Sequence, residues 1–143
     1  MSSRETSLWR WLSKAKPIYR KRLFMRRVEN LVSSGFSDVI GCCDEVNFYI
    51  ELKCEDYVDD KEIHVRFEPG QIEFMEELID AGGNYYVLLN AKNLVSGKET
   101  KLLISGTEGK ILTGPISISR LIRTPGYVVT SPKDAIEHMR SLM

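Results

Sequence analysis

The sequence predicts an α/β (α+β) domain in which a mixed β-sheet is flanked by helices. Segments 36–43, 48–52 and 85–89 are rich in β-branched and aromatic residues and are bounded by turn residues, which is typical of strands. Segment 71–81 carries apolar residues at helical spacing between the second and third of these runs. Strand-helix-strand order favours a right-handed crossover and a last strand parallel to the one that contains Glu51.

The first 30 residues are predicted to be a basic helical segment. A first helix, capped by Thr6 or Ser7, places Leu8, Trp11 and Leu12 on one face and is interrupted at Lys16-Pro17. A second helix is predicted over 18–33, with an apolar stripe on one side and basic residues around the other, ending before Gly35.

The next two runs predict an antiparallel strand pair joined by the turn residues Asp44, Glu45 and Asn47. Strand side chains alternate between faces, so Glu51 and Lys53 share one face of the second strand. A buried ion costs several kcal/mol unless it is paired or binds something. The pair therefore indicates either a functional site or an exposed strand face with a Glu-Lys salt bridge.

The rest of the chain is predicted to complete the sheet and its helical layers. We expect an acidic loop over 54–62, a short edge strand over 63–67, and a helix that begins near Gln71 and ends at Gly82-Gly83. Further elements are a turn at 94–98, a strand at 101–104, a loop at 106–115, a strand at 127–129 and a helix at 132–142, with Ser131 and Asp134 as a capping box.

Charge is distributed unevenly along the 143 residues, although the formal net charge is zero. Residues 1–30 carry nine basic and two acidic side chains, a net charge of +7; residues 31–80 carry −11 and the remainder +4. A basic arm beside an acidic centre suits a protein that holds phosphates at its edge and concentrates divalent cations in the middle. A solvated basic helix next to an acidic core is the alternative.

Composition predicts one soluble domain in a reducing compartment. An apolar content of 43% and a charged content of 28% are ordinary for a folded domain, and we expect no membrane span and no secretory signal. Three cysteines without CxxC spacing are read as buried strand residues and not as a disulfide framework or a soft-metal site. A cytoplasmic, nucleoid-associated location is expected.

The spacing Asp38, twelve residues, Glu51-Leu52-Lys53, followed by Gln71 in the next helix, resembles the signature of the PD-(D/E)XK nuclease superfamily in its VRR-NUC and Holliday-junction-resolvase branches. The resemblance covers 29–91 and implies a restriction-endonuclease-like core of αβββαβ type, within a single domain over 1–143 whose C-terminal part, 92–143, is an extension. Ser37 stands where the superfamily has Pro, a residue that shapes the backbone and binds no metal.

The resemblance implies metal-dependent hydrolysis of phosphodiester bonds with Mg²⁺ or Mn²⁺, hard cations that prefer oxygen ligands. The cation ligands it implies are Asp38, Glu51, the backbone carbonyl of Leu52 and the upstream Glu29. Lys53 would orient the attacking water or stabilise the phosphate oxygens, and Gln71 would position Lys53 or the water. No other cofactor is expected.

DNA, branched or duplex, is the partner that the resemblance implies, and the family hints at a phage or mobile-element source. The predicted nucleic-acid contacts are Arg20, Lys21, Arg22, Arg26, Arg27 and Arg66. Junction cleavage needs two active sites, so a homodimer is expected, with the Trp-bearing N-terminal helix as a candidate interface. The competing hypotheses are a non-catalytic DNA-binding or inhibitor module that keeps the fold, and an interaction domain with no nucleic-acid partner.

Overall fold

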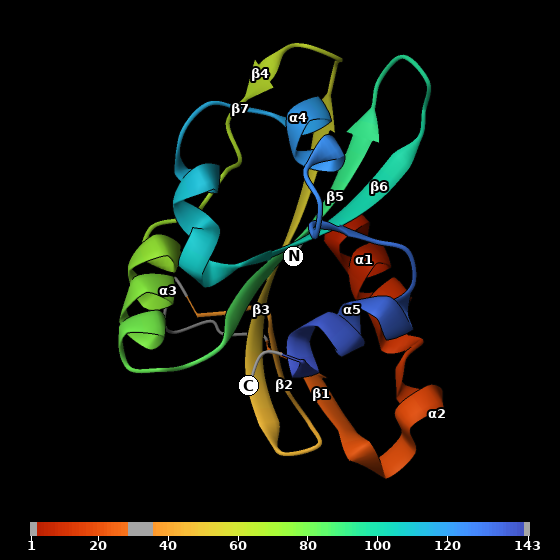
Figure 1. The fold of residues 1–143 in the computed structure, drawn as a ribbon, viewed down its shortest axis with the longest axis vertical. Coiled ribbons are helices and arrows are strands. Elements are labelled where there is room, and N and C mark those ends of the chain that lie inside the picture. The colour runs from red at the N-terminus through yellow and green to blue at the C-terminus, as the bar shows by residue number, and fades with distance from the viewer. Residues whose placement is uncertain (1–2, 29–35, 142–143) are drawn as a thin grey trace.

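A six-stranded mixed sheet forms the centre of the molecule in the computed structural model, which describes residues 3–28 and 36–141 (Figure 1). Its strands lie in the order β1-β2-β3-β5-β6-β8. Only β3 and β5 are parallel to each other, and every other neighbouring pair in this sheet is antiparallel. The strands are β1 (Leu23–Arg27), β2 (Val39–Cys43), β3 (Val46–Tyr57), β5 (Tyr85–Asn93), β6 (Glu99–Ser105) and β8 (Val128–Val129).

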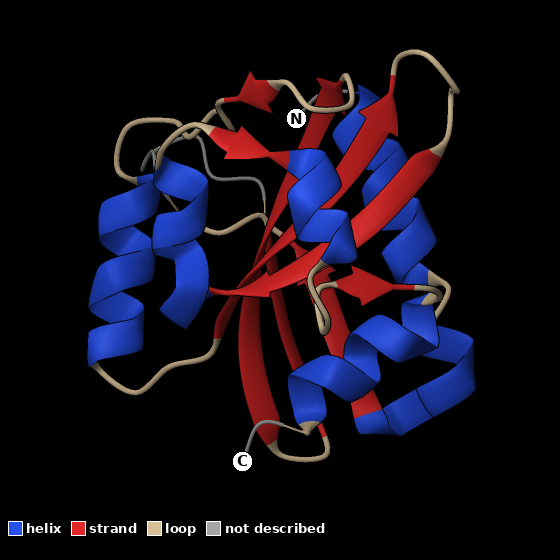
Figure 2. Ribbon diagram, turned by 45° about the horizontal axis from the view of Figure 1, so that its top comes forward, coloured by secondary structure: helices blue, strands red, loops and turns tan. Residues whose placement is uncertain are grey.

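Helices cover both faces of this sheet (Figure 2). One face is covered by α1 (Ser3–Ser13), α2 (Lys16–Tyr19) and α5 (Pro132–Arg140), and the other by α3 (Gln71–Asp80), the 3₁₀ segment η2 (Gly106–Thr113) and α4 (Ile118–Arg123). A second, two-stranded sheet pairs β4 (Glu62–Ile63) with β7 (Ile116–Ser117). None of the helices in the described ranges has both the length and the apolarity needed to span a bilayer.

Two apolar cores follow from this layering, one on each face of the sheet. Leu8 and Leu12 of α1 and Ile136 of α5 pack with Ile50 and Leu52 of β3 on the first face. Met75 of α3, Leu112 of η2 and Ile118 of α4 pack with Val87 and Leu89 of β5 on the second. Successive side chains of β3 and β5 point to opposite faces and therefore contribute to both cores, as expected for central strands buried on both sides.

The predicted β2–β3 hairpin and the parallel β5 strand are confirmed. Asp44 and Glu45 both have positive φ, 48° and 74°, the backbone of a two-residue turn that matches the twist of its strands. Arg22 and Arg140 hold the Asp44 carboxylate at 2.7 Å each, which anchors this turn to η1 (Arg20–Arg22) and α5. The prediction of a loop over 54–62 is wrong in part, because β3 continues to Tyr57 and pairs with β5 as far as Asn93.

The predicted helix over 18–33 is wrong in the part that the structure describes. The helix α2 stops at Tyr19, Arg20 adopts a positive φ of 55°, and Leu23–Arg27 form strand β1 against β2. Leu23 and Met25 are buried while Phe24 and Arg26 are exposed, which is a strand period. The β2 backbone supplies hydrogen-bond partners that outweigh the local helical pattern; residues 29–33 lie outside the described residues.

The C-terminal third matches its predicted strands and final helix. Ser131 accepts a hydrogen bond from the Asp134 amide at 3.0 Å, as the N-cap of a capping box does. Asp134 accepts its reciprocal bond at 2.9 Å from the amide of Thr130, one residue before the N-cap, so the predicted capping box is confirmed in its first bond only. Two predictions need correction: 106–115 is mostly 3₁₀ helix, and the strand over 63–67 is reduced to Glu62–Ile63. Apolar residues of η2 bury themselves against α3 and the sheet, which orders the segment.

Substituting Gly41 tests the packing of the β2–β3 pair. A Cβ at Gly41 would lie 2.6 Å from Cζ of Phe48, whose side chain is fully buried and cannot move away. We expect Gly41→Ala to lower the free energy of unfolding by about 1–3 kcal/mol in urea denaturation, the usual cost of overpacking. Gly114→Ala is the matched control, because Gly114 has extended backbone and open space around its Cβ position; an equal loss there would contradict the packing argument.

Candidate active site

The two predicted metal-binding carboxylates, Asp38 and Glu51, come from adjacent strands and lie on the same face of the sheet. Val39 pairs with Ile50 in the antiparallel register, which sets Asp38 opposite Glu51. The two side chains lie on the same face of the sheet because directly opposed residues of paired strands share a face. Glu51 is 0% exposed, and Asp38 is partly exposed at the start of β2.

The Glu51 carboxylate is buried with one oxygen satisfied and the other not. The Tyr85 hydroxyl donates to Glu51 Oε2 at 3.3 Å, whereas Oε1 has no hydrogen-bond partner. Burial raises the pKa of Glu51 first, and the neighbouring Asp38 raises it further, while Lys53 and Tyr85 act in the opposite direction. Two ionised carboxylates cannot hydrogen-bond to each other, so a proton or a cation between them would add a stabilising interaction to those of Lys53 and Tyr85.

Asp38 is oriented by the backbone of β3. Its Oδ2 accepts a hydrogen bond from the Leu52 amide at 2.9 Å. The N–H and C=O groups of one strand residue point to the same side of the strand, so the Leu52 carbonyl is directed to the Asp38 side as well. Strand geometry thus places the Asp38 and Glu51 carboxylates on one face of the sheet and directs the Leu52 carbonyl toward the Asp38 side.

Lys53 is held next to this pair by Gln71. Lys53 is 8% exposed, and its Nζ donates to Gln71 Oε1 at 2.8 Å. The same Gln71 oxygen accepts from the Glu68 amide at 2.8 Å, which fixes the side chain in the first turn of α3. The ammonium also lies 4.9 Å from the ring centre of Phe67, a favourable cation-π distance.

An aromatic cluster forms the wall behind Glu51. Phe74 packs against Phe36, Tyr49 and Tyr85 with ring centres 5.0, 6.2 and 5.9 Å apart, respectively. These rings remove water from the carboxylate side, which is the physical source of the desolvation that raises the pKa of Glu51. Tyr85 also contributes its hydroxyl, so one residue both excludes water and holds Oε2.

The sequence pattern does not single out two residues of this site, Tyr85 and Phe67. The sequence predicts Tyr85 only as part of a strand, because its place beside Tyr49 of β3 follows from the β3–β5 register. A tyrosine at that position on a parallel neighbour of β3 lies on the Glu51 face. Phe67 follows β4 in irregular structure, and its contact with Lys53 had no signal in the sequence.

Asp38, Glu51 and the Leu52 carbonyl offer only oxygen atoms as metal ligands, which is the ligand type that a hard divalent cation prefers. One of these oxygens, Glu51 Oε1, is buried without a hydrogen-bond partner. Within 3–28 and 36–141, the structure contains no group of three or more His, Cys, Asp or Glu side chains arranged to hold a metal. The predicted further ligand Glu29 lies outside the described residues, as does Gly35. Asp38, Glu51 and the Leu52 carbonyl are therefore the described residues that would hold the cation.

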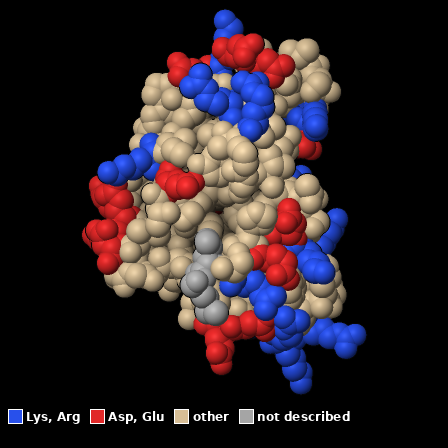
Figure 3. All heavy atoms as spheres, in the orientation of Figure 1, with Lys and Arg blue, Asp and Glu red and all other residues tan. Residues whose placement is uncertain are grey.

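The predicted DNA-contacting side chains differ in exposure and in whether an acidic side chain already pairs with them. Arg22 binds Asp44 through two nitrogens at 3.0 and 2.7 Å, so its charge is largely compensated. Arg20, Lys21, Arg26 and Arg66 are exposed, and Arg27 is half-buried on β1. The charges are only partly separated: Figure 3 shows acidic side chains over α3 and basic ones over α2 and η1 at the opposite corner, but Arg4–Asp56 and Arg22–Asp44 ion pairs at 2.8 and 2.7 Å join the basic arm to the acidic segment.

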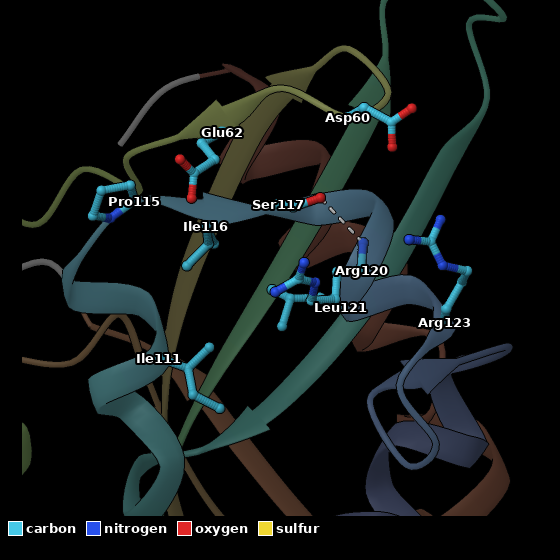
Figure 4. Close-up of a pocket in the computed structure, with 9 residues that line it drawn as sticks. All are labelled: Asp60, Glu62, Ile111, Pro115, Ile116, Ser117, Arg120, Leu121 and Arg123. Carbon is cyan, nitrogen blue, oxygen red and sulfur yellow. Dashed lines mark hydrogen bonds between the residues drawn. The ribbon is translucent and has the colours of Figure 1, made fainter.

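A pocket of about 490 Å³ lies away from the acid pair, between β4, β7, η2 and α4 (Figure 4). Its charged lining residues are Asp60, Glu62, Arg120 and Arg123, and it includes none of the predicted site residues. Opposite charges face each other across it, so it has no clear preference for an anion or a cation.

Comparison with known proteins supports the fold. No family model matches the sequence, and no curated protein does. Among solved structures, the fold is similar to that of Hjc, a Holliday junction resolvase from the archaeal hyperthermophile Archaeoglobus fulgidus, with a TM-score of 0.57, covering 96% of this chain and 99% of that chain. At 16% sequence identity the likeness shows a shared fold, which confirms the predicted α/β class with its mixed, helix-flanked sheet.

The raised pKa of Glu51 predicts that the free energy of unfolding, measured in EDTA, depends on pH. An unfolded Glu ionises near pH 4.3, whereas folded Glu51 holds its proton to higher pH, so wild-type stability falls as pH rises from about 4.3 toward the raised pKa. Glu51→Gln removes the charge and supplies an amide donor. We expect the free energy of unfolding of this variant to be higher than that of wild type by at least about 1 kcal/mol in urea denaturation at pH 8, with a smaller difference at pH 5.

The control for this comparison is Glu76→Gln, which changes an exposed carboxylate on α3. It should leave the free energy of unfolding unchanged at both pH values. A Glu51→Gln effect of equal size at pH 5 and pH 8 would show that titration of the buried acid is not its cause.

Proposed function

We propose that this protein is a metal-dependent nuclease that hydrolyses phosphodiester bonds in branched DNA. The observation that carries the proposal is the buried pair of Asp38 and Glu51, with one unsatisfied oxygen, beside a lysine that Gln71 holds in place. The likeness to the archaeal resolvase supports the same function, since a Holliday junction is a branched DNA. A location where DNA is accessible, such as a cytoplasm, belongs to the same proposal.

Asp38, Glu51 and the Leu52 carbonyl would bind Mg²⁺ or Mn²⁺, and Glu29 would add a further carboxylate. Such a cation, when bound, lowers the pKa of a coordinated water and compensates charge on the scissile phosphate. Lys53 directs its ammonium at the reacting phosphate or water, and Gln71 and Phe67 keep it from turning away. The aromatic wall keeps bulk water off the Glu51 side.

Cleavage assays test the proposal directly. With labelled junction, flap and linear DNA, wild type should cleave in Mg²⁺ or Mn²⁺ and not in EDTA. Glu51→Gln and Lys53→Ala should each lose about 10²-fold or more in rate, since each removes one preorganised charge, while DNA binding in EDTA is kept. The matched controls Glu76→Gln and Lys92→Ala change exposed residues and should cleave normally. Full cleavage by Glu51→Gln would refute the proposal.

Tyr85→Phe separates positioning from chemistry. The substitution keeps the ring and removes the hydroxyl that donates to Glu51 Oε2. A hydrogen bond to a charged group contributes about 1.5–3 kcal/mol, so we expect the Mn²⁺ concentration for half-maximal cleavage to rise by about tenfold or more. Saturating Mn²⁺ should restore most of the rate. A loss of rate that Mn²⁺ does not restore would mean that Tyr85 does not act through the cation site.

The non-catalytic module remains the second candidate, and the same experiments distinguish it. It predicts DNA binding that is independent of metal, no cleavage of any substrate, and no effect of Lys53→Ala. A homodimer is part of the nuclease proposal, because resolution of a four-way junction requires two cuts; sedimentation of the free protein measures it.

A further inference from the structure

A shallow groove of about 430 Å³ follows the outer edge of β1. Trp9 and Lys16 form one wall, from the helical layer on one face of the sheet, and Phe24 and Arg26 project from the other face. The strand β1 is terminal in the described sheet, so half of its backbone N–H and C=O groups have no strand partner among the described residues. The groove therefore offers backbone donors, cations and aromatic rings together.

This groove leads to the candidate active site. Arg27 pairs with Val39, and the Val28 amide donates to the Asp38 carbonyl at 2.8 Å, so the end of β1 runs beside the start of β2 where Asp38 lies. Arg26 pairs with Ile40, two residues from Asp38, and both side chains lie on the Asp38 face. A chain bound along β1 would continue directly toward the acid pair.

The cations of the groove are held in place without being neutralised. Lys16 Nζ lies 5.0 Å from the ring centre of Trp9, and the Arg26 guanidinium carbon lies 5.8 Å from that of Phe24. Within the described part of the chain, neither cation forms an ion pair, in contrast to Arg22 with Asp44 at 2.7 Å. A cation-π contact orders the side chain but leaves its full charge for an anion.

The exposed ring decides which polyanion fits. Phe24 is 47% exposed, beside cations that would meet phosphates. A duplex presents its backbone and keeps its bases stacked inside, whereas an unpaired strand also presents base faces to an aromatic ring. We infer that the β1 groove binds single-stranded DNA, the unpaired arm of a branched substrate; this deepens the proposed function and depends on it.

A second copy of the chain is a poorer occupant. Symmetric pairing of two β1 edges would bring Lys16, Arg26 and Arg27 of one copy toward the same residues of the other, and like charges at close range are destabilising. Charge complementarity therefore favours an anionic strand.

Binding in EDTA tests this inference independently of cleavage. Fluorescence anisotropy with labelled oligo-dT and with a duplex of equal length should give tighter binding of the single strand. Phe24→Ala should weaken oligo-dT binding by about tenfold, within the range for loss of one stacked base, and change duplex binding by less than about twofold. Lys16→Gln with Arg26→Gln should reduce the salt slope for oligo-dT by about 1.4, at roughly 0.7 per phosphate contact.

Matched controls come from exposed residues far along the chain. Val95→Ala removes a side chain that is 82% exposed in the β5–β6 turn, and Arg123→Gln removes an exposed cation of α4. Both should bind oligo-dT as wild type does. Equal losses in the controls and in the groove variants would overturn the inference.

Three other results would overturn it: tighter binding of duplex than of single strand, an unchanged oligo-dT affinity in Phe24→Ala, or a change of sedimentation in that variant that accounts for its loss of binding. Failure of the nuclease proposal looks different, since wild type would then bind oligo-dT through the groove but cleave nothing. If wild type cleaves branched DNA but Phe24→Ala binds oligo-dT as tightly as wild type, only the groove inference is overturned.

Discussion

The constraint on which the rest of the site depends is the juxtaposition of two carboxyl groups, Asp38 and Glu51, on neighbouring strands. Glu51 is fully buried, and one of its oxygens has no hydrogen-bond partner. Such an arrangement reduces stability, because burial and like charge both oppose ionisation. Proteins retain this kind of local cost mainly where a bound proton, cation or substrate compensates it. The neighbouring Lys53 and Tyr85 each offset the cost in part.

Hairpin register makes this juxtaposition possible. A slip of one residue between β2 and β3 would turn one carboxylate to the opposite face, since strand side chains alternate. The two-residue turn at Asp44 and Glu45 fixes the register, and Arg22 and Arg140 hold that turn from two other elements. Side chains at the far end of the hairpin therefore determine the geometry of the acid pair.

Local patterns were sufficient to predict the hairpin, the α3 helix and the parallel β5 strand, because each has its own period and its own turn residues. They were insufficient for β1, since the apolar and basic residues of 18–33 also fit a helix, and only the unpaired edge of β2, distant in sequence, favours a strand. The spacing of Asp38, Glu51 and Lys53 predicted their proximity because they lie on adjacent strands. The place of Gln71 beside Lys53 followed from the family resemblance, and the first turn of α3 brings the two together. Tyr85 required knowledge of the β3–β5 register.

Exchanging a helix for a strand in this segment also changes its functional interpretation. Basic residues around a helix would form a diffuse positive surface, with no defined path to the acids. On β1, strand alternation sends Phe24 and Arg26 to the face that carries Asp38 and Glu51, and pairing with β2 fixes their distance along the sheet from Asp38. The strand β1 is therefore the first strand of the αβββαβ order. The hydrogen bonds that pair it with β2 also align its positively charged edge with the candidate active site. In the proposed function, substrate guidance and sheet completion are then consequences of a single backbone pairing.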